Sequence, residues 1–83
     1  MADPGDQGVL DEIHALMEVE HELLERHPHT GRDAAIDEQL RELDVQIDQL
    51  WDLLRQRRAL RRAGSDPAGA AVRPPGTVEG YQQ

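Results

Sequence analysis

The chain has 83 residues, 37% of them hydrophobic, and its only aromatic side chains are Trp51 and Tyr81. This length allows one small domain with little material for a core, and the lack of cysteine excludes disulfides and thiolate metal sites. The net charge of −8 argues against general binding of nucleic acid. The N-terminal segment is acidic and no stretch is apolar for long enough to cross a bilayer, so we expect a cytoplasmic protein that does not bind membranes.

A first helix is predicted from about Gln7 to about His27, because apolar residues recur there at helical spacing along one face. That face comprises Val9, Leu10, Ile13, Leu16, Met17, Leu23 and Leu24. Glu20 falls on the same face, where an apolar side chain is expected. We expect it close to Arg41 or Gln46 of a second helix, either as a half-buried pair that fixes the register or as a surface pair of little consequence.

A second helix is predicted from Ala34 to about Ala63, after a segment, residues 28–33, that contains a proline, a glycine and capping residues. Gly64 is placed to end this helix in a left-handed conformation. Its apolar residues alternate in steps of four and three, the spacing of coiled-coil-like pairing, and Trp51 beside them is a candidate core or interface residue. The stripe comprises Ile36, Leu40, Leu43, Ile47, Leu50 and Leu54.

These elements predict an all-α fold, an antiparallel two-helix hairpin over residues 1–63 with an extended tail rich in proline and glycine over residues 64–83. A hairpin alone buries one stripe per helix, and the apolar surface of the second helix is wider than one partner can cover. We therefore expect self-association, most simply a homodimer that forms a four-helix bundle. The tail either packs back on the second helix or stays free as a recognition segment.

A basic run closes the second helix, and we expect it to project past a first helix that ends opposite about Leu54. Arginine binds carboxylates and phosphates through paired hydrogen bonds, so the run is a candidate patch for an acidic protein partner, or for a nucleotide or nucleic acid. No aromatic residue interleaves the arginines, which argues against binding of single-stranded nucleic acid. The alternative is that the run complements the helix dipole and is neutralised by N-terminal acids. The run comprises Arg55, Arg57, Arg58, Arg61 and Arg62, and the acids are Asp3, Asp6, Asp11 and Glu12.

Glu18 and His21 form a Glu-x-x-His pair, and His14 lies one turn before Glu18 on the same helix. This spacing occurs among the ligands of di-metal helical bundles, so a metal-binding bundle is an alternative to a solvated acidic helix face. We expect no other cofactor. The chain has one serine, no cysteine and no glycine-rich phosphate loop, and a two-helix module offers no evident cleft, so the sequence argues against an enzyme.

Residues 43–59, Leu-Asp-Val-Gln-Ile-Asp-Gln-Leu-Trp-Asp-Leu-Leu-Arg-Gln-Arg-Arg-Ala, resemble the actinobacterial domain-of-unknown-function family 2630, a family of short helical proteins. Further similar stretches are residues 13–16, 20–21, 72–74 and 78–81, so that the resemblance covers nearly the whole chain. The resemblance implies no activity, because the family has none assigned. It also implies that the tail is part of the module. The sequence therefore favours a non-enzymatic interaction or regulatory module.

Overall fold

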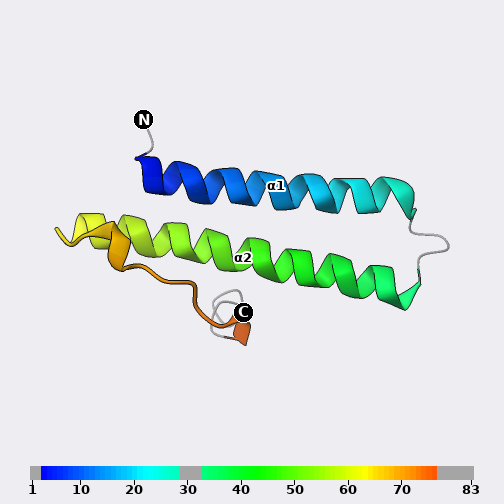
Figure 1. The fold of residues 1–83 in the computed structure, drawn as a ribbon. Helices are drawn as coiled ribbons and strands as arrows, with labels where there is room; N and C mark the ends of the chain where they lie inside the picture. The colour runs from blue at the N-terminus through cyan, green and yellow to red at the C-terminus, as the bar shows by residue number, and fades with distance from the viewer. Residues whose placement is uncertain (1–2, 29–32, 77–83) are drawn as a thin grey trace.

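Two α-helices lie side by side and run in opposite directions in the computed structural model, which describes residues 3–28 and 33–76 (Figure 1). α1 spans Pro4–Arg26, α2 spans Ala34–Arg62, and a short 3-10 helix, η1, spans Pro67–Gly69. The predicted all-helical fold with two packed helices is confirmed. Among the described residues, no helix combines the length and apolar character needed to cross a membrane.

Side-chain caps set where each helix begins. The Asp3 carboxylate accepts a 2.9 Å hydrogen bond from the Asp6 amide, and Pro4 occupies the first helical position. Proline suits that position because its φ angle is already helical and it has no amide hydrogen to leave unpaired. α1 therefore begins three residues before the expected Gln7. Asp33 caps α2 in the same way, through its side chain.

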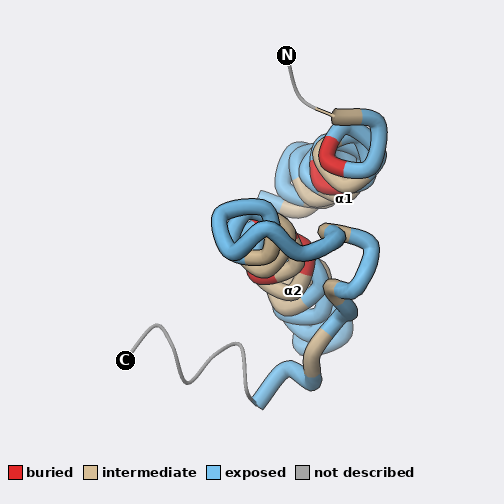
Figure 2. The backbone as a smooth tube through the Cα atoms, turned by 90° about the vertical axis from the view of Figure 1, so that its left-hand side faces the viewer, coloured by how far each residue is buried: buried red, intermediate tan, exposed pale blue. Residues whose placement is uncertain are grey.

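The core is small and lies between the two helices. Its buried apolar side chains are Ile13, Ile47, Leu50 and Leu54. Figure 2 shows the buried positions of α1 on the side of that helix that faces α2. The rest of the predicted stripe in α2 is half-buried, namely Ile36, Leu40 and Leu43. Trp51 keeps an exposed fraction of 39% and is not part of this core.

The chain turns back along α2 after Gly64, whose φ of 77° lies in the left-handed region that glycine adopts without strain. The tail then follows the face of α2 that carries Gln49 and Gln56, one heptad apart (Figure 1). Gln56 donates to the Ala71 carbonyl at 2.8 Å, and Gln49 donates to the Arg73 carbonyl at 3.1 Å. Of the two alternatives for the tail, packing on α2 is the one observed over these residues.

A buried ion pair joins the tail to α2. The Asp52 side chain is 1% exposed, and the Arg73 guanidinium donates to both of its carboxylate oxygens, from Nε at 2.8 Å and from Nη2. Gln56 adds a third hydrogen bond at 2.9 Å. The bonds from Arg73 hold the pKa of Asp52 below its ordinary value. A buried carboxylate without a partner is strongly unfavourable, so α2 depends on the tail at this point.

We expect Arg73→Ala to lower the free energy of unfolding by about 1–3 kcal/mol, because it leaves the Asp52 carboxylate buried with one donor. Urea denaturation followed by circular dichroism measures this loss. Arg62→Ala is the matched control, since Arg62 is exposed, and should change stability by less than about 0.5 kcal/mol. Adding Asp52→Asn to Arg73→Ala should recover part of the loss. Equal stability of Arg73→Ala and the wild type would contradict a stabilising tail.

Candidate functional site

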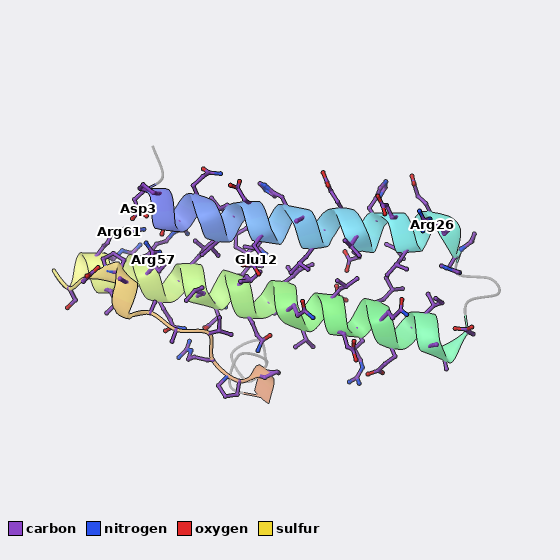
Figure 3. All side chains as sticks on the ribbon, in the orientation of Figure 1. Asp3, Glu12, Arg26, Arg57 and Arg61 are labelled. Atoms are coloured by element: carbon purple, nitrogen blue, oxygen red, sulfur yellow. The ribbon has the colours of Figure 1, made fainter. Side chains whose placement is uncertain are left out.

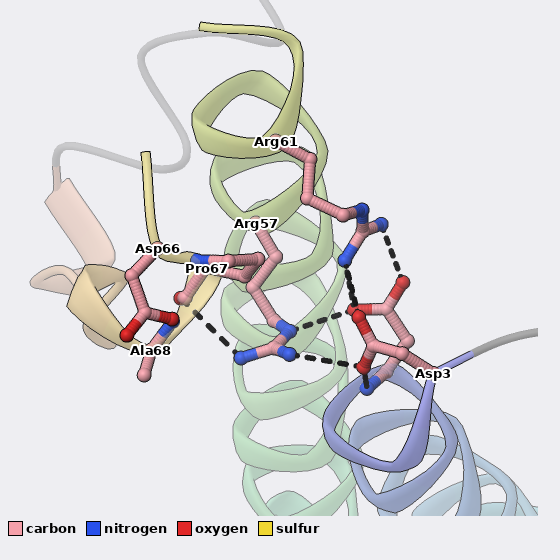
Figure 4. A network of polar contacts seen from close by, with 7 residues as sticks. Asp3, Arg57, Arg61, Asp66, Pro67 and Ala68 are labelled. Atoms are coloured by element: carbon pink, nitrogen blue, oxygen red, sulfur yellow. Dashed lines mark hydrogen bonds and ion pairs between the residues drawn. The ribbon is translucent and has the colours of Figure 1, made fainter. Parts of the chain in front are cut away.

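Four charged side chains form a cluster at the open end of the hairpin, where α1 begins and α2 ends (Figures 3 and 4). We call Asp3, Asp6, Arg57 and Arg61 the ionic clamp. Arg61 donates to Asp6 at 2.6 Å and to Asp3 at 2.8 Å. Arg57 donates from Nε to Asp6 at 2.6 Å and from Nη2 to Asp3 at 3.1 Å. The clamp therefore connects the two helix ends through both carboxylates and both guanidinium groups.

Burial makes the clamp more than a surface ion pair. Asp6 is 7% exposed, and the hydrogen bonds from Arg61 and Arg57 hold its pKa at about 2. The pKa of Arg57 is raised above its already high ordinary value, chiefly by its bond to Asp6. Arg57 also donates to the Pro67 carbonyl at 3.3 Å, so that one guanidinium contacts α1 and η1 together (Figure 4).

Gly5 makes room for the clamp. A β-carbon at this position would lie 2.2 Å from Nη2 of Arg57, which is closer than atoms can approach. By contrast, nothing lies within 4 Å of a β-carbon at Gly8, one turn further along α1. The missing side chain at Gly5 therefore lets the Arg57 guanidinium lie against the first turn of α1.

The clamp divides the predicted arginine patch into two sets. Arg57 and Arg61 are bound within the chain, so the expectation that they project past the first helix is wrong, because α1 begins earlier than predicted. Arg55, Arg58 and Arg62 are exposed. Within residues 3–28 and 33–76, no hydrogen bond or ion pair engages these three side chains. They are the part of the patch that remains accessible to another molecule.

Two of the four N-terminal acids expected to neutralise the arginines lie outside the clamp. Asp11 accepts a 2.8 Å hydrogen bond from Gln7 within α1. Glu12 lines a shallow hollow with Val72 of the tail. Asp3 and Asp6 are therefore the acids that neutralise Arg57 and Arg61.

Of the five large apolar side chains that are exposed in the described residues, three lie on one flank of the hairpin, whereas Val19 and Val72 lie elsewhere. Met17, Leu24 and Trp51 have exposed fractions of 47%, 44% and 39%. Leu24 and Asp44 line the same shallow hollow between the helices, which places them on one flank. Met17 lies one heptad before Leu24, and Trp51 lies one heptad after Asp44, so all three apolar side chains share that flank. We call Met17, Leu24 and Trp51 the apolar flank.

Two carboxyl groups meet across the helices at the edge of the apolar flank. Hydrogen bonding with Asp44, followed by burial, raises the pKa of Glu20 to about 7. The main influence on Glu20 is therefore a second acid and not the expected Arg41 or Gln46. Arg41 donates to Glu38 at 2.7 Å and lines the same hollow as the two carboxyl groups.

The predicted metal ligands lie on the outer side of α1. His14, Glu18 and His21 are all exposed, and His21 lies 3.1 Å from the carboxylate of Glu25. In the described part of the chain, no three histidine or carboxylate side chains converge in a way that could hold a metal ion. The physical reason is that the three candidates come from a single helix, whose outer side faces no second helix.

Comparison with known proteins places the chain in a family. A family model for a protein of unknown function, DUF2630, matches residues 5–83. The chain belongs to the DUF2630 family. Uncharacterized proteins from Mycobacterium bovis and from two strains of Mycobacterium tuberculosis are 46% identical to it over 79 residues, covering 94% of this chain and 91% of each relative. No solved structure matches the chain significantly.

Two contacts of this DUF2630 protein lie outside what its sequence pattern predicted. One is the ion pair of Asp52 with Arg73, and the other is the meeting of Glu20 with Asp44. Arg73 is the only basic residue after Arg62, and this was the one feature of the sequence that could have indicated its ion pair with α2. The Glu20 contact had no signal, because the rotation of one helix against the other decides which residue faces it.

The clamp of this DUF2630 protein predicts opposite effects for two glycine substitutions in α1. Gly8→Ala should raise the free energy of unfolding by up to about 1 kcal/mol, because alanine favours the helix and meets nothing there. The free energy of unfolding of Gly5→Ala should be lower than that of Gly8→Ala by about 1 kcal/mol or more, because the added methyl group displaces the Arg57 guanidinium. Thermal and urea denaturation measure both. Equal gains at the two positions would show that the clamp contributes nothing to stability.

The raised pKa of Glu20 predicts that Glu20→Gln stabilises the DUF2630 fold at alkaline pH. The pKa of Glu20 in the folded state, about 7, exceeds its ordinary value of 4.5. The Glu20 carboxyl group therefore makes its full favourable contribution to the free energy of unfolding below pH 4.5, and this contribution is lost as the pH rises through 7. At pH 8 we expect a gain of about 1 kcal/mol after allowing for solvent screening, and no gain near pH 4. Urea denaturation in dilute solution checks this. Glu18→Gln, on the exposed side of α1, is the control.

Proposed function

We propose that this DUF2630 protein is a non-enzymatic helical interaction module that works by self-association through its apolar flank. The observation that carries this proposal is the gathering of Met17, Leu24 and Trp51 on one flank while the monomer buries only a small core. Exposed apolar side chains that cluster on a soluble surface are typical of interaction sites. Tryptophan in particular is enriched among the residues that dominate binding energy.

The thickness of the molecule supports the same proposal. Its extents are 50 × 27 × 15 Å, and the shortest is little more than the roughly 10–12 Å diameter of one helix with its side chains. The hairpin is therefore a single layer, whereas stable helical domains pack at least two layers around a core. A second hairpin laid against the apolar flank supplies the missing layer and forms a four-helix bundle.

The non-enzymatic part of the proposal rests on the character of the described surface. The hollows that contain titratable side chains are shallow and open to solvent. The four clamp residues are already bound to one another in ion pairs between the helix ends, and Arg57 also donates a hydrogen bond to the tail. Catalysis usually requires a reactive group held in a site from which water is excluded, and these features favour binding over chemistry.

Sedimentation equilibrium tests the proposal on the purified chain. We expect the wild type to be a dimer at micromolar concentration and Trp51→Ser to weaken self-association by at least about tenfold. Met17→Ser should act in the same direction. Val19→Ser is the control, because Val19 is 45% exposed but lies in the hollow on the opposite flank, beside Leu43. A wild type that stays monomeric would overturn the proposal.

A further inference from the structure

The charges on the open face of α2 are arranged symmetrically around Trp51. Asp44 and Asp48 precede Trp51 by seven and three residues, and Arg55 and Arg58 follow it by four and seven. At 3.6 residues per turn these spacings bring all five side chains to one face of the helix. From the N-terminal to the C-terminal end, this face therefore carries two acidic residues, the tryptophan and two basic residues.

This order of charges is complementary to the same order on a second helix that runs in the opposite direction. If a second copy of α2 is laid antiparallel with Trp51 opposite Trp51, the acidic half of each helix lies over the basic half of the other. A two-fold axis produces this arrangement, because an isologous interface pairs each patch with the same patch on the second copy. Arg58 then lies over Asp44 of the second copy, and Arg55 lies over Asp48.

The described structure leaves this face available. Trp51, Asp44, Arg55 and Arg58 are exposed, and Asp48 is half-buried. Within the described residues no hydrogen bond or ion pair engages either arginine. The tail runs along a different face of α2.

α1 supplies an independent indication of the same axis. Leu10 and Met17 are one heptad apart, on the side of α1 that borders the apolar flank. Two contacts, Asp6 with Arg57 and Glu20 with Asp44, show which residues of α1 and α2 lie opposite each other. In this alignment, the point midway between Leu10 and Met17 lies opposite Trp51 to within about one residue. The axis through Trp51 therefore also places Leu10 of each copy over Met17 of the other.

We propose that the chain forms an antiparallel homodimer with its two-fold axis at Trp51, in which Arg55 and Arg58 of each copy pair with Asp48 and Asp44 of the other. This inference rests on the proposed self-association and adds the partner, the direction and the register. It also gives the accessible arginines an acidic partner, the second copy of the same chain. Apolar side chains at the centre supply affinity, and the flanking charges select the antiparallel register.

Two charge-reversal variants test the register. Arg55→Glu with Arg58→Glu makes the whole face acidic, and Asp44→Arg with Asp48→Arg makes it basic. Each variant alone should self-associate at least about tenfold more weakly than the wild type, whereas an equimolar mixture should form a heterodimer. Glu12→Arg with Glu42→Arg, at exposed positions that line hollows on the opposite flank, makes the same change in net charge as the basic variant and should leave the dimer intact. Circular dichroism shows whether each variant is folded.

The outcomes separate this inference from the proposed function. A dimeric wild type whose two charge variants both stay dimeric and do not exchange in the mixture would overturn the register and leave self-association standing. A monomeric wild type would overturn both. If the acidic variant alone fails to fold, disulfide cross-linking tests the register instead. A single introduced cysteine is then the only thiol in each chain, because the natural chain has no cysteine. At a protein concentration raised about tenfold to offset the lost tryptophan contact, Trp51→Cys should then form a disulfide-linked dimer on oxidation and Val19→Cys should not, and the reverse result would overturn the register.

Discussion

Ion pairing between the start of α1 and the end of α2 closes the hairpin at the end that no loop connects. Asp3 and Asp6 lie where free amides favour negative charge, and Arg61 lies in the last turn of α2, where the helix dipole favours positive charge. The helix dipoles and the side chains therefore act in the same direction. Because Arg57 also binds the Pro67 carbonyl, this contact fixes the point from which the tail runs back along α2.

The tail in turn decides which surface of α2 stays open. α1 covers the side of α2 that carries Ile47 and Leu54, and the tail covers the side that carries Gln49 and Gln56. The flank that carries Trp51 lies outside both contacts. The proposed interface is therefore built on Trp51, the large apolar side chain of α2 that the described hairpin and tail leave exposed, and its position follows from how the other two faces are used.

Helical phase gives neighbouring arginines different roles. Arg57 and Arg61 are one turn apart and point to the start of α1, where two carboxylates bind them. Arg55 and Arg58 belong to the same basic run but lie on the open flank. In a chain with a net charge of −8, a face whose two arginines form no ion pair with the described residues is suited to an acidic partner, and a second copy of this chain presents one.

The sequence by itself determined the helix pair and its antiparallel direction, because the apolar spacing and the short connection are local signals. The same kind of signal, Asp3 followed by Pro4, also marks the early start of α1, although periodicity alone placed that start at Gln7. Only the tertiary structure decided that Asp52 is buried under the tail and that Trp51 is left exposed. Both depend on how far one segment is rotated against another distant in sequence, and packing sets that rotation where no local pattern records it.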